Sequence, residues 1–277
     1  MKFDNDDLAA SQLAEEAQRF RSRATNERRG PLKIIVSDFE FAYDMQSFRK
    51  YQQAEDDATD GWVRWPFHQI CGAAWAIITF RPRLKQPIIS DIAVMTWDSF
   101  SQLSIVTAYL AAVSANPDAV LHSWGGEQKD WPVVRRVAMS HGLLLPKQLT
   151  DLRPHSDFRI DLCNSTSGQA RCVHLPEYAT AVGIPSKPMP SVAVGSAVLC
   201  QRWDQVAKQV FGDLLTISII AARHTVAYGR CEVDLSLTEQ VIAKAFCSSR
   251  LENTFLSDAD GALAVHRNIS NSAVVGG

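Results

Sequence analysis

Two acidic residues follow an apolar run near the start of the chain, and their types and spacing suit them to bind a metal ion. The β-branched run predicts a buried strand over residues 32–37, with Asp38 and Glu40 at its end. Because side chains alternate along a strand, both carboxylates share one face, while Phe39 and Phe41 point to the other. Carboxylates this close raise each other's pKa unless a cation neutralises them, and Mg²⁺ or Mn²⁺ is the usual cation at such oxygen donors. The alternative interpretation is a solvated strand end.

Two further acids occupy informative positions. Asp130 follows a short apolar strand over residues 118–124 and a Gly125–Gly126 loop, which places it at the end of a sheet. It also opens a helix with a proline in the first turn, so a role as N-cap is the alternative. Asp213 lies beside the apolar stripe of a helix predicted over residues 201–223, where an acid without a nearby cation is costly. Both positions favour the metal-binding interpretation of the first pair.

The order and spacing of these acids resemble the DEDD superfamily of 3′–5′ exonucleases, in particular the stand-alone relatives of the proofreading domain of family B DNA polymerases. Asp38 and Glu40 match the first motif of that family, Asp130 matches the second and Asp213 the third. The resemblance covers about residues 31–225. It implies an α/β fold of the ribonuclease H-like class, with a mixed five-stranded sheet flanked by helices.

The resemblance also implies a function: metal-dependent 3′–5′ hydrolysis of phosphodiester bonds in single-stranded nucleic acid with a free 3′ end, with DNA favoured and a role in DNA repair. The four acids would then hold two Mg²⁺ or Mn²⁺ ions. Aromatic residues next to the acids in the sequence, and one lysine in a turn, are candidate nucleic-acid contacts: Phe39, Phe41, Trp131 and Lys187. An exposed loop lysine is the alternative for the last of these.

The third motif departs from the family. Relatives place a Tyr four residues before the last acid or a His five before it, and here these positions hold Gln209 and Lys208. Gln209 takes the catalytic position, but an amide does not accept a proton at useful pH, so activity is expected to be impaired. General-base assistance contributes about 10² to 10⁴ in rate, so its loss need not abolish hydrolysis. The alternative is a DEDD-like scaffold that binds nucleic acid or a protein partner and hydrolyses poorly.

Composition limits the remaining possibilities. The net charge of −2 gives no overall attraction to nucleic acid, so contacts with phosphates must come from local clusters of basic residues. The six cysteines form no CxxC pair, which favours free thiols over zinc binding. No apolar run approaches the length of a membrane span, so a soluble, cytoplasmic protein without a membrane partner is expected.

The pattern along the chain predicts one exonuclease-like domain over residues 31–255, between an N-terminal helical arm (1–30) and a flexible tail (256–277). Residues 44–61 are polar and acidic and predict a mobile insertion. Asp98 is expected to be an N-cap, and Asp161 is expected to cap a helix or turn. Further strands are predicted over 68–80, 86–96 and 158–163, and the first two form an antiparallel meander together with 32–37. Further helices are predicted over 98–115, 174–183 and 234–252.

Overall fold

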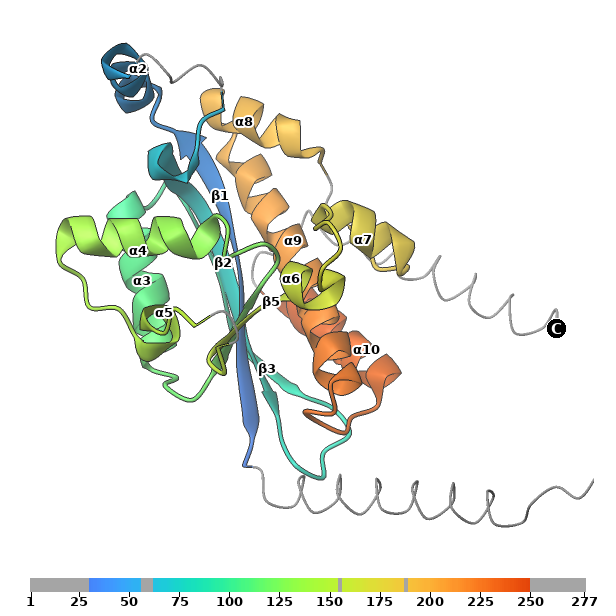
Figure 1. The fold of residues 1–277 in the computed structure, drawn as a ribbon. Helices are drawn as coiled ribbons and strands as arrows, with labels where there is room; N and C mark the ends of the chain where they lie inside the picture. The colour runs from blue at the N-terminus through green and yellow to red at the C-terminus, as the bar shows by residue number, and fades with distance from the viewer. Residues whose placement is uncertain (1–29, 56–61, 154–155, 187–188, 250–277) are drawn as a thin grey trace, which may run out of the picture.

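The computed structural model describes residues 30–55, 62–153, 156–186 and 189–249 of the chain (Figure 1). The predicted arm and tail lie outside this part, apart from Gly30. The strands are β1 (Leu32–Tyr43), β2 (His68–Phe80), β3 (Ile88–Thr96), β4 (Val120–Ser123) and β5 (Arg159–Asp161). The helices are α2 (Met45–Ala54), η1 (Trp65–Phe67), α3 (Gln102–Ser114), α4 (Asp130–His141), α5 (Lys147–Thr150), α6 (Leu162–Ser167), α7 (Leu175–Ala181), α8 (Ser191–Leu199), α9 (Trp203–Ala227) and α10 (Leu235–Ser248).

The five strands form one mixed sheet in the order β3-β2-β1-β4-β5. The first three pair antiparallel, and β4 and β5 continue the sheet in parallel. This confirms the predicted meander and the ribonuclease H-like sheet flanked by helices. Strand β1 is longer than predicted, because it pairs with β2 from Leu32 as far as Tyr43. The two acids of the first motif therefore lie within a central strand, next to a bulge between Glu40 and Phe41.

Helices cover both faces of the sheet. Helices α3, α4 and α5 lie on one side and α9 and α10 on the other, as Figure 1 shows with the sheet edge-on. Alternate β1 side chains pack into these two layers: Ile34 and Val36 join the core with α9, and Ile35 and Phe39 join the core with α3. Asp38 continues the alternation that places Ile34 and Val36 toward α9. The alternation of side chains along β1 therefore turns Asp38 toward α9, so a third acid near it must come from that helix.

Helix α9 is long and apolar enough to cross a membrane by length and composition alone. However, 78% of its most apolar window is buried within the protein. Its apolar side chains, Val210 and Leu214 among them, fill the core against the sheet. We therefore interpret α9 as the central core helix of the domain.

Three sequence-based expectations about local structure are wrong. Part of the predicted 44–61 insertion is helix α2, which Asp44 caps by accepting a hydrogen bond from the Ser47 amide. The residues 56–61 lie outside the described part of the chain. Asp98 does not cap α3, because that helix begins later and Ser101 accepts from the Ser104 amide. Helix α8 was not predicted, since the prolines before it suggested only turns.

Candidate active site

Three of the predicted acids come together between β1 and α9. Ligand oxygens of Asp38, Glu40 and Asp213 all lie within 4.8 Å of one another. Strand alternation brings the first two to the α9 face, and α9 contributes the third from its buried side, where Asp213 is 6% exposed. The first and third motifs are more than 170 residues apart in the chain. The structure brings their acids together in one cluster of carboxylates.

A glycine allows α9 to lie this close to the sheet. Gly72 of β2 is the register partner of Glu40 and faces α9. A Cβ at this position would lie 3.0 Å from Cγ1 of Val206 and 3.5 Å from Cβ of Glu40. Any larger residue would push the first turns of α9 outward or displace the acid. Gly72 is therefore a positioning residue that the sequence alone did not single out.

Asp130 reaches the same site from the other layer. It is the first residue of α4 and 5% exposed, and Lys129 rather than Asp130 occupies the N-cap position. Asp130 therefore lies inside the first turn of α4, and the N-cap alternative is wrong. Asp130 lines a cavity of about 350 Å³ together with Asp38 and Asp213. All three motifs thus contribute an acid to one cavity.

The acids repel one another in a buried setting. Burial is the largest cause that raises the pKa of Asp38 well above its ordinary value, and neighbouring carboxylates raise it further in the order Asp213, Glu40, Asp130. Burial likewise raises the pKa of Asp130 to about 7, although Lys129 opposes the shift. Buried carboxylates of like charge favour a cation with oxygen ligands, because the cation removes both the repulsion and the desolvation cost.

Gln209 is a partner of the third acid. Its Nε2 donates a hydrogen bond of 2.7 Å to Oδ2 of Asp213, one helical turn away, and its side chain is fully buried. This contact confirms that the two side chains project to the same side of α9. It also fixes the orientation of the Asp213 carboxylate, so the geometry supports a positioning role for Gln209 rather than direct contact with a reacting water.

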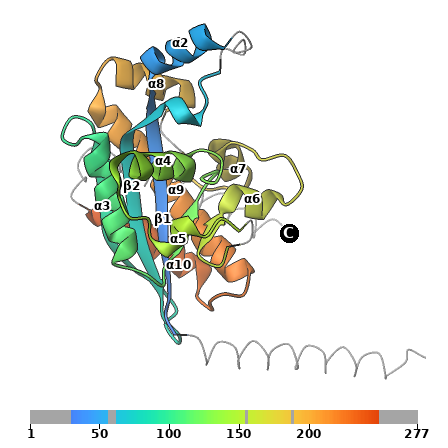
Figure 2. The same cartoon turned by 60° about the vertical axis from the view of Figure 1, so that its left-hand side comes forward.

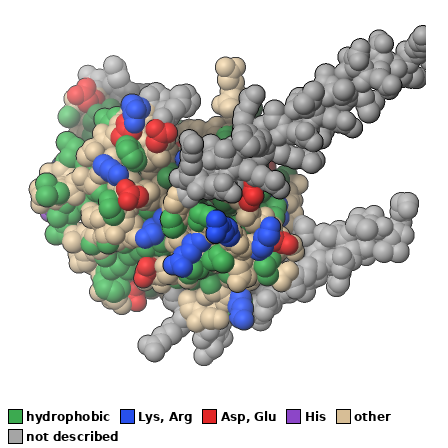
Figure 3. Space-filling view, turned by 90° about the horizontal axis from the view of Figure 1, so that it is seen from below, with side chains coloured by type: hydrophobic (Ala, Val, Ile, Leu, Met, Phe, Trp, Pro, Cys, Tyr) green, Lys and Arg blue, Asp and Glu red, His purple; other side chains and the backbone are tan. Residues whose placement is uncertain are grey.

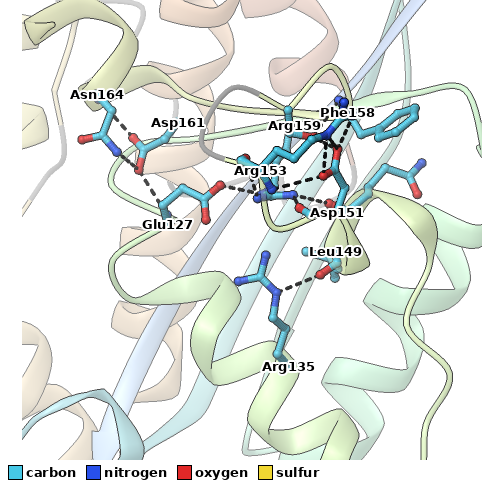
Figure 4. Close-up of polar contacts among 11 residues, drawn as sticks. Glu127, Arg135, Leu149, Asp151, Arg153, Phe158, Arg159, Asp161 and Asn164 are labelled. Carbon is cyan, nitrogen blue, oxygen red and sulfur yellow. Dashed lines mark hydrogen bonds and ion pairs between the residues drawn. The ribbon is translucent and has the colours of Figure 1, made fainter.

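Asp161 organises the loop that leads to Asp130. Its carboxylate caps α6 by accepting from the amides of Cys163 (3.0 Å) and Asn164 (3.3 Å), which confirms the predicted cap. The same carboxylate accepts from the amides of Gly125 (2.9 Å) and Glu127 (3.1 Å), part of the network in Figure 4. One side chain therefore ties β5 and α6 to the glycine loop before α4.

A buried ion pair supports the same loop. Arg159 of β5 donates from Nε to Oε1 of Glu127 at 2.5 Å, and its side chain is 2% exposed (Figure 4). Its Nη1 also donates to the carbonyl oxygens of Gln148 and Asp151. Within the loop, a Cβ at Gly126 would lie 2.9 Å from Cβ of Ser123, so only glycine fits there. None of these residues has a motif-like spacing, which is why the sequence did not reveal them.

Three of the four predicted nucleic-acid contacts are buried side chains. The rings of Phe39 and Phe41 are 3% and 6% exposed, and Trp131 is fully buried in the core between the sheet, α3 and α4. Burial away from the cavity contradicts a base-stacking role for Phe41 and Trp131, whereas Phe39 is buried but lines the cavity beside Asp38. Lys187 lies outside the described residues. Two cavity-lining residues were missed instead: the half-buried Trp124 and the exposed Lys129, whose ammonium lies 4.5 Å from the centre of the Phe41 ring.

Comparison with known proteins supports the fold. No family model and no curated protein matches the sequence. Among solved structures, the family B DNA polymerase from the hyperthermophilic archaeon Pyrobaculum calidifontis matches with a TM-score of 0.50 and 13% identity, over 76% of this chain and 27% of the polymerase. Exonuclease I bound to the inhibitor BCBP matches at 0.38 and 10% identity, over 73% and 44% of the chains. E. coli exonuclease I in complex with a dA16 oligonucleotide matches at 0.37 and 10%, over 71% and 42%.

The chain thus spans about a quarter of the polymerase and less than half of exonuclease I. The polymerase match confirms that the chain has the ribonuclease H-like exonuclease fold that its motifs predict.

Proposed function

We propose that this protein is a metal-dependent 3′–5′ exonuclease that hydrolyses single-stranded nucleic acid, with DNA as the favoured substrate. The observation that carries the proposal is the convergence of Asp38, Glu40 and Asp213 within 4.8 Å, with Asp130 in the same cavity. These acids come from three separate elements, in the order and positions that the DEDD motifs require. An accidental surface cluster would not explain why Asp130 and Asp213 are buried and why Asp38 and Glu40 are only partly exposed.

The donor set suits two Mg²⁺ or Mn²⁺ ions, because every candidate ligand is a carboxylate oxygen. Bound ions of this kind would generate the attacking hydroxide and stabilise the leaving oxygen. In this chain, Asp38, Glu40, Asp130 and Asp213 would hold them, and Gln209 keeps the last carboxylate oriented through its 2.7 Å hydrogen bond. A bound cation would offset the burial and the repulsion between carboxylates that raise the pKa of Asp38 in the metal-free protein.

The size of the cavity supports the proposal of a chain-end substrate. Its volume of about 350 Å³ is at the lower end of small-ligand pockets, and a terminal nucleotide is of that size. Trp124 in its wall offers an aromatic face to a base, and Lys129 offers an ammonium group to a phosphate. These two residues take the place of the aromatic contacts that proved to be buried.

Local basic charge supplies the attraction that the net charge does not. Arg81, Arg83 and Lys85 are exposed in the hairpin between β2 and β3, and Figure 3 shows Lys and Arg side chains gathered on the face seen from below. From Ala74, the register partner of Asp38, the strand runs six residues to Phe80 before this hairpin, a distance of about 20 Å along the sheet. Phosphates several nucleotides from the reacting end would meet this surface.

A proton acceptor is available even though Gln209 is not one. His174 is exposed and lines the cavity together with the acids, and a neutral imidazole has a ring nitrogen that can accept a proton. We assign it the role of assisting water deprotonation. His174→Gln should lower the hydrolysis rate by about tenfold or more and flatten its pH dependence while Mn²⁺ affinity is kept. An unchanged rate and pH profile would remove this role.

The test of the function uses linear single-stranded DNA labelled at its 5′ end, with Mg²⁺ or Mn²⁺. Stepwise shortening is expected with wild type and should be lost in Asp38→Asn and Asp213→Asn. Asp118→Asn is the matched control, because its side chain is 95% exposed on the surface. Cleavage of closed circular single strands would indicate an endonuclease instead. Binding of the DNA by fluorescence anisotropy without any hydrolysis would favour the scaffold alternative.

A further inference from the structure

Two cysteines lie side by side in the wall of the acidic cavity. Cys163 belongs to α6 and is buried, and Cys172 lies in the 168–174 segment between α6 and α7, where it is partly exposed. Both residues line the cavity. Each of the six cysteines is a free thiol in the structure. The position of this pair, beside the acids but not among them, is unexplained by metal binding.

Reciprocal hydrogen bonds hold the two sulfurs together. The Cys163 Sγ donates to the carbonyl oxygen of Val173 at 3.6 Å, next to Cys172 in the chain. The Cys172 Sγ donates to Oδ1 of Asn164 at 3.1 Å, next to Cys163. Each cysteine therefore contacts a residue adjacent to the other, and both side chains line the same cavity wall. This arrangement places the two side chains next to each other, where a disulfide is the bond that two neighbouring thiols can form.

We propose that Cys163 and Cys172 form a reversible disulfide when the protein meets a peroxide, so that one wall of the cavity responds to redox state. Hydrogen peroxide is the oxidant. The Cys172 sulfur attacks one peroxide oxygen and the O–O bond breaks, which gives a sulfenic acid and one water. The Cys163 sulfur then attacks the Cys172 sulfur and displaces hydroxide, which leaves as a second water with the Cys163 proton. Two thiols and one peroxide become one disulfide and two waters.

The surroundings explain the order of these steps. Cys172 is partly exposed and reaches the cavity, so peroxide can meet it first. Burial is the main cause that raises the pKa of the Cys163 thiol to about 12, so Cys163 stays protonated and unreactive toward peroxide until an oxidised partner lies beside it. A sulfenic acid next to a second thiol condenses to a disulfide.

The disulfide would restrict the 168–174 segment, which already contacts the wall of the acidic cavity. The carbonyl oxygen of Val173 also accepts a hydrogen bond of 3.1 Å from Nε1 of Trp124, the residue before the glycine loop that leads to Asp130. The same segment ends at His174 in the cavity wall. A disulfide between 163 and 172 would close a short loop and restrict this segment to one arrangement. The inference does not depend on the nuclease proposal, since the bond is detected chemically.

The test treats the full chain with hydrogen peroxide, blocks the remaining thiols and measures intact mass and peptide linkage. The expected result is loss of two hydrogens, a linked pair of peptides containing residues 163 and 172, and complete reversal by dithiothreitol. Cys172→Ser should abolish the linkage, and Cys200→Ser, which removes an exposed cysteine elsewhere, should leave it intact. Amides of 168–174 should exchange hydrogen more slowly in the oxidised protein.

Three results would overturn the proposal. Oxidation of Cys172 could stop at the sulfinic or sulfonic acid, Cys172 could link to a cysteine other than Cys163, or Cys163 could form a disulfide with another cysteine in Cys172→Ser. Circular dichroism of the variants confirms that they fold. Cys163→Ala serves as a second variant, since it removes the buried partner without adding a polar group, and it should trap the sulfenic acid on Cys172.

Discussion

The burial of Asp130 leads to a specific dependence of stability on pH in the metal-free protein. Its pKa is about 7 in the folded protein, against an ordinary value of 3.8, chiefly because the carboxyl is buried. The folded state therefore binds more protons than the unfolded state between these two values. Stability must fall as pH rises through this window, and the ionised carboxylate must destabilise the fold most above about pH 7.

The magnitude follows from the linkage relation. The gap between 3.8 and about 7 corresponds to a destabilisation of about 4 kcal/mol once the carboxyl is fully ionised, at about 1.36 kcal/mol per pKa unit. Between about pH 5 and about pH 8, the change attributable to Asp130 is roughly 2–3 kcal/mol. Asp130→Asn keeps the shape and removes the charge, so it should gain this amount relative to wild type as pH rises.

Urea unfolding in the presence of a chelator, at several pH values, measures the difference. Comparison with the variant is necessary because two buried histidines also make stability depend on pH. Burial is the main cause that lowers the pKa of His122 to about 3 and that of His224 to about 4. The protein therefore loses stability as pH falls below the pKa that these histidines have in the unfolded chain. That trend is common to both proteins and cancels. Asp118→Asn should show no pH-dependent difference from wild type. A constant difference between Asp130→Asn and wild type at every pH would refute the reasoning.

The remaining predictions concern residues that position the acids. Asp161→Ala should lower the free energy of unfolding by about 2–4 kcal/mol in urea titrations, because several buried amides lose their acceptor. The same variant should bind Mn²⁺ more weakly in calorimetry, because Asp161 holds the loop that leads to Asp130. The same Mn²⁺ affinity in variant and wild type would contradict this role of Asp161. Gly72→Ala should destabilise the protein by about 1–3 kcal/mol through overpacking, and Val206→Ala in the same chain should restore part of this loss. Gln209→Leu should weaken Mn²⁺ binding by freeing the Asp213 carboxylate, whereas an unchanged affinity would show that the 2.7 Å contact does not position it.

The strands and the first pair of acids were predictable because they depend on local periodicity. Alternation over residues 32–40 fixed the common face of Asp38 and Glu40, and the spacing of apolar residues in α9 placed Asp213 beside the core stripe. The length of β1 was not predictable in the same way, since it depends on pairing with β2 as far as His68. The prediction that the acids converge came from the resemblance to a family. The structure brings Asp38, Glu40 and Asp213 together and places Asp130 in the same cavity.

The errors have a common physical origin: sequence proximity to an acid says little about which side of an element a side chain occupies. Phe39 and Phe41 flank Glu40, yet alternation turns them into the opposite core, as the same reasoning that paired the acids should have shown. Trp131 follows Asp130, but the helix rotates it into the core against the sheet. The supporting residue Asp161 was recognised as a cap, while its hydrogen bonds to the glycine loop depend on the tertiary pairing of β4 with β5.

Gln209 shows how a departure from a motif can be reinterpreted once burial is known. Its spacing to Asp213 correctly predicts that both side chains lie on one side of α9, at the position where relatives have a proton acceptor. The structure buries it completely and commits its amide to the Asp213 carboxylate, so this position holds that carboxylate in a fixed orientation. A tyrosine here would need space that a fully buried site does not offer. If proton transfer assists hydrolysis in this protein, Gln209 is not the acceptor, and His174 in the cavity wall is the residue that we propose for this role.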